Sequence, residues 1–125
     1  MREITKTIDL PLGGETRTFR LTKLDAFSGV SLLRCLESWQ TSHPDAPALN
    51  LLDLLYSLPE WELHRWMKTA LSHVDLVLPA GRTPVWSEGC WGDPALEPDA
   101  PLCLRLTQEI LSFTLSGFFR DTAQA

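Results

Sequence analysis

The sequence lacks the residue patterns that identify most metal-binding and nucleic-acid-binding proteins. Its three cysteines, Cys35, Cys90 and Cys103, are odd in number and form no CxxC pair, so we expect neither a disulfide framework nor a zinc site of that type. Lysine and arginine occur eleven times in total and are scattered singly, and the formal net charge is −5. This charge disfavours non-specific binding to nucleic acid or to an anionic membrane, and we expect neither as a partner.

The residues that could carry chemistry are few and scattered. His64 and His73 are nine positions apart, so they do not share a helix face as an HExxH pair would. Together with Cys90 they are an alternative zinc set, without the usual ligand spacing. Cys35 is expected to pack inside a helix, and an enzyme that uses Cys35 or Cys90 is the third of our hypotheses. The glycine turns PLGGE and PAGRT match neither phosphate-binding pattern, and the sequence predicts no catalytic residue, metal or cofactor.

No segment has the character of a signal peptide or a membrane span. The first residues, MREITKTIDL, contain no apolar stretch of the necessary length. The apolar segment 102–121 is interrupted by Arg105, Gln108 and Glu109, so it should not cross a membrane. With the unpaired cysteines, this favours a reducing compartment, and we expect a cytoplasmic protein.

The length of 125 residues suits a single domain, 1–125, with a hydrophobic core of its own. Residues 1–22 predict a β-hairpin, because apolar residues alternate on both sides of a turn at Gly13 and Gly14. A lone hairpin is only marginally stable in water. It should therefore pack on other elements or pair with more strand.

Residues 24–76 predict helices. Asp25 or Ser28 could cap the first, Asn50 could cap the short segment LLDLLYSL, and Pro59 suits the first turn of PEWELHRWMKTALSHV. Apolar residues recur in the first helix at helical spacing, namely Phe27, Val30, Leu33 and Leu36, with Trp39 following. The expected buried stripe of the third helix is Leu63, Trp66, Met67, Ala70, Leu71 and Val74.

Residues 77–100 form a segment rich in proline and acidic residues, which excludes a long helix. Trp86 and Trp91 lie in it, although solvated linkers seldom carry tryptophan. We expect an ordered loop with short strands, such as a hairpin around Trp86, and at least one indole packed on the helical core. The predicted fold class is α+β, with the N-terminal β-hairpin packed on a mainly α-helical domain of about four helices.

The C-terminal helix, 101–120, carries more apolar side chains than one stripe needs. One side holds Leu104, Leu111, Leu115 and Phe118, and a second side holds Leu106, Ile110 and Phe113. Either one side packs into the core while the other meets a partner, or the hairpin and the third helix enclose the helix from both sides.

Five tryptophans are large amphipathic anchors of the kind enriched at protein interfaces. They are not accompanied by the basic residues of a nucleic-acid platform. The residues that we expect at a partner-binding surface are Trp61, Trp86, Trp91, Leu106, Ile110, Phe113, Phe118 and Phe119.

The stretches FRLTKLDAFSGVSLLRCL, after the hairpin, and LRLTQEILSFTLSGFF, near the end, give the chain a recognisable layout. It resembles the tail assembly chaperones of tailed bacteriophages and prophages, in which a KL.AF…LL..L segment follows the hairpin and the last helix tends to read L…EAL.FNFGDFF. The matching residues are Lys23-Leu24, Ala26-Phe27, Leu32-Leu33, Glu109, Leu111, Phe113 and Gly117-Phe118-Phe119.

The resemblance implies a non-enzymatic role in virion assembly in the host cytoplasm. Such chaperones are thought to keep the tape measure protein, a long helical client, soluble before tail tube subunits polymerise around it. The expected partners are that client, the tail tube protein as a further client, and a second copy of the chain. The alternative is a small acidic bacterial adaptor, such as a secretion chaperone or an immunity protein, whose charge suits a basic effector or toxin.

Overall fold

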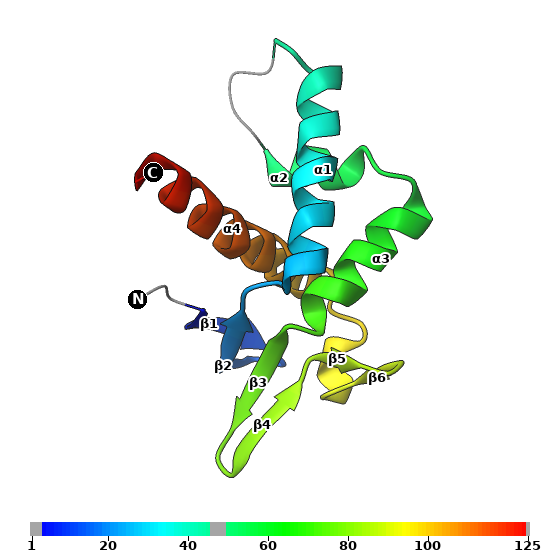
Figure 1. The fold of residues 1–125 in the computed structure, drawn as a ribbon. Helices are drawn as coiled ribbons and strands as arrows, with labels where there is room; N and C mark the ends of the chain where they lie inside the picture. Colours follow the sequence, from blue (N-terminus) through cyan, green and yellow to red (C-terminus); the bar gives the residue numbers. More distant parts are fainter. Residues whose placement is uncertain (1–3, 46–49, 125) are drawn as a thin grey trace.

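The computed structural model describes residues 4–45 and 50–124, and in the last helix it describes side chains up to Ser116. In these residues a four-stranded antiparallel sheet and four α-helices build an α+β fold (Figure 1). The sheet has the order β1 (Thr5–Leu12), β2 (Glu15–Thr22), β3 (Val74–Leu78) and β4 (Gly81–Pro84). The helices are α1 (Ala26–Ser42), α2 (Leu51–Tyr56), α3 (Glu60–Leu71) and α4 (Ala100–Gln124). Two short strands, β5 (Trp86–Ser87) and β6 (Cys90–Trp91), and the 3-10 helix η1 (Pro94–Leu96) connect the sheet to α4.

The N-terminal hairpin is extended by strands from a distant part of the chain. β2 pairs with β3, so that Leu21 lies opposite Val74 and Phe19 opposite Leu76. The expectation that the third helix includes Val74 is wrong. α3 ends at Leu71, and the fully buried Val74 begins β3. Backbone pairing with β2 gives this residue a place in the sheet that the apolar spacing within the helix could not reveal.

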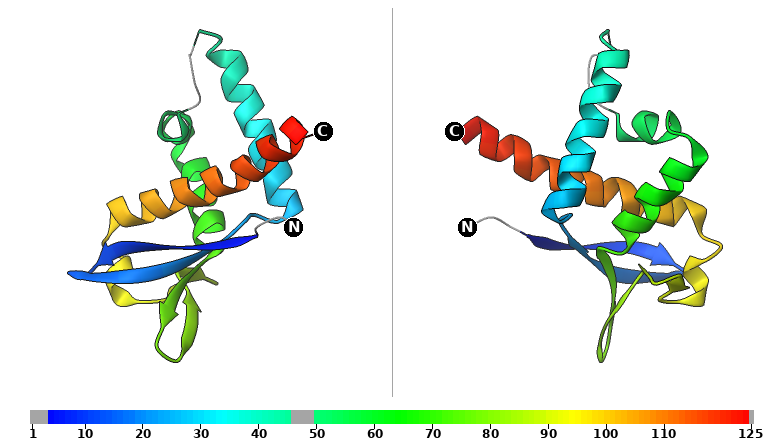
Figure 2. Two further views of the ribbon diagram at one scale, coloured as in Figure 1. Left: turned by 90° about the vertical axis from the view of Figure 1, so that its left-hand side faces the viewer. Right: turned by 45° about the vertical axis from the view of Figure 1, so that its right-hand side comes forward.

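α4 lies across one face of the sheet and also packs against α3 (Figure 2). Leu106 and Ile110 from one of its apolar sides are fully buried, and so is Leu111 from the other. Phe113 is also buried, beneath the ammonium groups of Lys6 and Lys23, which lie 5.0 and 4.9 Å from the centre of its ring. As far as Ser116, both apolar sides of α4 therefore pack into the core.

The acidic segment before α4 is ordered around a hairpin at Trp86, as predicted. Trp86 pairs with Trp91 across β5 and β6, and their rings meet edge to face with centroids 4.9 Å apart. Glu88 and Gly89 between the strands both have positive φ, at 51° and 79°, as a tight hairpin turn requires. Both indoles are half-buried against the core, which confirms the prediction that at least one of them packs there.

Asp25 caps α1, as one of the two predicted alternatives had it. Its carboxylate accepts a hydrogen bond of 3.1 Å from the backbone N–H of Ser28, and hydrogen bonding from Ser28 holds the pKa of Asp25 below its ordinary value. The buried residues of α1 are Gly29, Leu32, Leu36 and Trp39.

The apolar series that begins at Phe27 does not stay on one face of α1. Each step of three residues turns by about 60° relative to the helix face. Over the three steps from Phe27 to Leu36 the series passes to the opposite side of the helix. Leu36 thus reaches the core, whereas Phe27 faces outward.

Candidate partner-binding site

α1 displays apolar side chains on the face that points away from the core. The exposed fractions of Phe27, Val30 and Leu33 are 88%, 65% and 40%. We call these three residues the outer stripe. They follow one another at three-residue intervals, so neighbouring members can touch while the row winds by about 120° around the helix. A contiguous group of exposed apolar side chains is the usual mark of a protein interaction surface.

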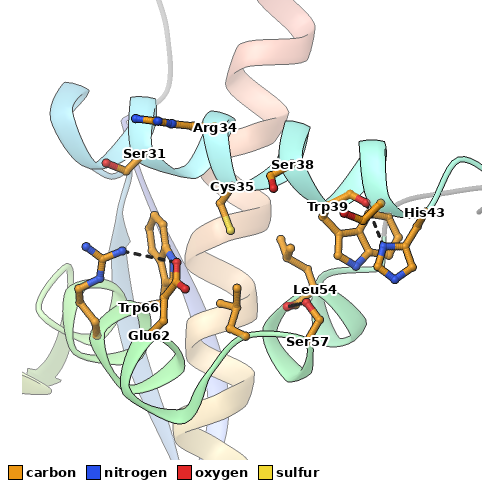
Figure 3. A pocket seen from close by; sticks show the side chains of 13 residues that line it. Ser31, Arg34, Cys35, Ser38, Trp39, His43, Leu54, Ser57, Glu62 and Trp66 are labelled. Carbon is orange, nitrogen blue, oxygen red and sulfur yellow. Dashed lines mark hydrogen bonds and ion pairs between the residues drawn. The ribbon is translucent and has the colours of Figure 1, made fainter.

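A cleft of about 580 Å³ separates the flank of α1 next to the outer stripe from α2 and α3 (Figure 3). A smaller cavity of about 70 Å³ shares Ser31, Arg65 and Trp66 with it and reaches Ser28 and Thr69. Together they follow α1 from Ser28 to Ser42, which is about 20 Å of helix. The α1 residues that line the larger cleft are Ser31, Arg34, Cys35, Ser38, Trp39 and Ser42, followed by His43, and those of the opposite wall are Leu54, Ser57, Leu58, Glu62, Arg65 and Trp66.

Two tryptophans of the cleft wall carry buried donors without an acceptor. Trp39 and Trp66 are 8% and 4% exposed, and neither indole Nε1 has a hydrogen-bond partner among the described residues. The Trp39 ring stacks on the His43 ring at 4.5 Å between centroids, and His43 Nδ1 lies 2.9 Å from the Trp39 carbonyl oxygen. A buried N–H without a partner costs about 1–3 kcal/mol.

The charged side chains of the cleft give it a small positive excess. Arg34 and Arg65 line it together with one carboxylate, that of Glu62, which pairs with Arg65 at 3.7 Å. The Arg65 guanidinium also lies 5.8 Å from the ring centres of both Trp61 and Trp66. Arg65 thus connects the cleft wall to Trp61, which is 66% exposed.

The cysteines differ in their surroundings. Cys35 is half-buried in the cleft, and burial, followed by the charge of Glu62, raises its pKa. Burial and the nearby Asp99 raise the pKa of Cys103 to about 11, so this thiol stays protonated at neutral pH. Cys90 is exposed in the β5–β6 hairpin.

The partner-binding residues expected from the sequence fall into three groups. Trp61 is exposed and adjoins the cleft through Arg65, while Trp86 and Trp91 are half-buried in the β5–β6 hairpin. Phe118 and Phe119 lie outside the described side chains. The core residues of α4 among them are Leu106, Ile110 and Phe113, which are buried and cannot contact a partner in this conformation.

Neither the outer stripe nor the cleft was expected to be a site. The spacing of Phe27, Val30 and Leu33 predicts the core-facing side of an amphipathic helix, and the sequence places Trp66 in the core. One feature could have indicated the cleft. Serines recur on one flank of the first helix, at positions 28, 31, 38 and 42, where small side chains leave space beside the helix.

Among the described residues, no group of three or more His, Cys, Asp or Glu side chains could hold a metal ion. None of the helices within this part of the chain has both the length and the apolar character needed to cross a membrane. Comparisons of the chain with protein families, with curated proteins and with solved structures gave no match.

Proposed function

We propose that this protein is a non-catalytic assembly chaperone of a bacteriophage tail, which binds the tape measure protein in the host cytoplasm through α1. The observation that carries the proposal is the outer stripe. A phenylalanine that is 88% exposed, followed by two further exposed apolar residues on the same helix, is unfavourable in water unless a partner covers it.

The stripe suits a helical client. Anchors spaced three or four residues apart are the means by which one amphipathic helix recognises an apolar groove or another helix. The KL.AF…LL..L segment, which resembles the chaperone family, is divided between core and surface. Its Leu24 and Leu32 are buried and support the fold. Its Phe27 and Leu33 lie on the surface, where a client can contact them.

The proposal is tested by co-expression with a tape measure protein encoded in the same genome. The intact chain should increase the soluble fraction of this client and co-purify with it. The double variant Phe27→Ser, Val30→Ser should stay folded but lose both effects. The matched control Tyr56→Ser, which removes a 62% exposed aromatic side chain from α2, should behave like the intact chain.

The alternative function, an adaptor for a basic effector or toxin, is favoured by the net charge of −5. It makes a different prediction. Such a partner would bind more weakly as the salt concentration rises, because charge attraction would dominate. Its binding would also be insensitive to the Phe27 and Val30 substitutions, and that result would contradict the chaperone proposal.

A further inference from the structure

We propose that the cleft between α1 and the α2–α3 pair binds an acidic segment of polypeptide, separately from the outer stripe. The inference rests on the proposed function in one respect, in that the segment would belong to the same client. The cleft and the stripe lie on neighbouring flanks of α1, so one chaperone could hold a client at two adjoining points.

The shape of the cleft favours a chain segment over a compact small molecule. With its smaller extension it follows α1 from Ser28 to Ser42, about 20 Å of helix. Serines along this flank let a backbone approach closely. Leu54 and Leu58 on the opposite wall offer apolar contact to the side chains of the segment.

The hydrogen-bonding groups of the cleft favour a ligand rich in acceptors. Trp39 and Trp66 line the cleft, and their indole N–H groups, buried within its wall, have no acceptor among the described residues. Arg34 and the serine hydroxyls add further donors, although Ser57 already donates to the Leu54 carbonyl oxygen at 2.6 Å. The carbonyl oxygens of a polypeptide are acceptors for the guanidinium and hydroxyl donors of this wall.

The charges of the cleft decide between acidic and basic segments. The cleft is lined by the guanidinium groups of Arg34 and Arg65 and by one carboxylate, that of Glu62, which pairs with Arg65. The cleft is therefore locally positive, although the net charge of the chain is −5. A carboxylate beside Arg34 would gain a charge-assisted hydrogen bond. A lysine at the same place would meet a like charge. The segment therefore combines acidic side chains with apolar ones.

The test uses two synthetic peptides that share the same leucine and alanine positions and differ only in carrying glutamate or lysine at the polar positions. In the uniformly ¹⁵N-labelled full chain, the indole N–H resonances of Trp39 and Trp66 are assigned with the variants Trp39→Phe and Trp66→Phe. The glutamate peptide should shift both resonances and the lysine peptide neither. Arg34→Glu should weaken binding of the glutamate peptide about tenfold, while Arg82→Glu on the distant β4 should not.

Alkylation of Cys35 gives a second measurement that needs no substitution among the residues of the cleft. In the Cys90→Ser variant, the glutamate peptide should slow the reaction of Cys35 and the lysine peptide should not. Equal effects of the two peptides, or none from either, would overturn the inference. If client binding at the same time remains sensitive to Phe27→Ser, only the cleft assignment fails. If the full-length client does not bind the intact chain at all, it is the proposed function that fails.

Discussion

The hydroxyl oxygen of Thr114 accepts a hydrogen bond of 3.1 Å from the backbone N–H of Leu24, across 90 residues of sequence. Both residues are buried, and Leu24 directly precedes the cap of α1. This bond fastens the start of α1 to the middle of α4. The outer stripe and the cleft begin within one helical turn of this point, so it sets the position of both surfaces.

Thr114→Val should therefore loosen the start of α1. The substitution keeps the shape of the side chain but leaves the N–H of Leu24 buried without an acceptor, which should cost about 1–3 kcal/mol of the free energy of unfolding. Amide hydrogen exchange at Leu24 should become faster. Thr114→Ser, which keeps the hydroxyl, should retain the protection of this amide. Equal protection in both variants would show that the bond is dispensable.

The apolar side of α4 that holds Leu106 and Ile110 should behave as core in stability measurements. Leu106→Ala and Ile110→Ala each remove a fully buried side chain, and each should cost about 2–5 kcal/mol. Val30→Ala in the exposed outer stripe should change stability by about 0.5 kcal/mol or less. Chemical denaturation measures all three. A small effect at Leu106 or Ile110 would mean that this side of α4 faces a partner after all.

Much of the local structure could be predicted because it depends on neighbouring residues. The turn at Gly13 and Gly14, the caps at Asp25 and Asn50, and the hairpin between Trp86 and Trp91 all follow from short-range chemistry. The sequence could not reveal which strand would pair with β2, since Leu21 and Val74 are far apart in the chain.

The candidate surfaces were missed for a related reason. The apolar residues of α1 surround the helix, and only its packing in the fold decides that Leu32 is buried and Phe27 exposed. The cleft depends on the spacing between α1 and α3, a tertiary property that has no counterpart in the pattern of either helix. The exposure of Trp61, by contrast, is compatible with the interface role expected for it.

Gly92 should tolerate no side chain. A Cβ atom at this position would overlap the carbonyl oxygen of Pro84, and the N–H of Gly92 donates to the Val85 carbonyl oxygen at 3.0 Å. Gly92→Asn should therefore lower the melting temperature clearly. Gly89→Asn places the same side chain in open space at a φ of 79°, and asparagine adopts a positive φ more readily than most residues. This control variant should therefore lower the melting temperature much less. Similar melting temperatures for the two variants would contradict this packing.

The three thiols should react with an alkylating reagent in a fixed order at pH 8. Exposed Cys90 should react first, and Cys35 more slowly, because burial raises its pKa and lowers the thiolate fraction. Cys103, with its pKa raised to about 11, should stay unmodified while the chain is folded. The rate at Cys35 should increase as the pH rises toward its pKa. Mass spectrometry of digested samples measures the order, and early modification of Cys103 would contradict its burial.

The most direct test of the central claim, that α1 binds a helical client through its outer stripe, is the affinity of a purified tape measure segment for Phe27→Ala compared with the intact chain. We predict a loss of about fivefold or more, corresponding to roughly 1 kcal/mol for a hot-spot residue, with an unchanged melting temperature. Tyr56→Ala should bind like the intact chain. An unchanged affinity for Phe27→Ala, in a folded protein that still binds the segment, would contradict the claim.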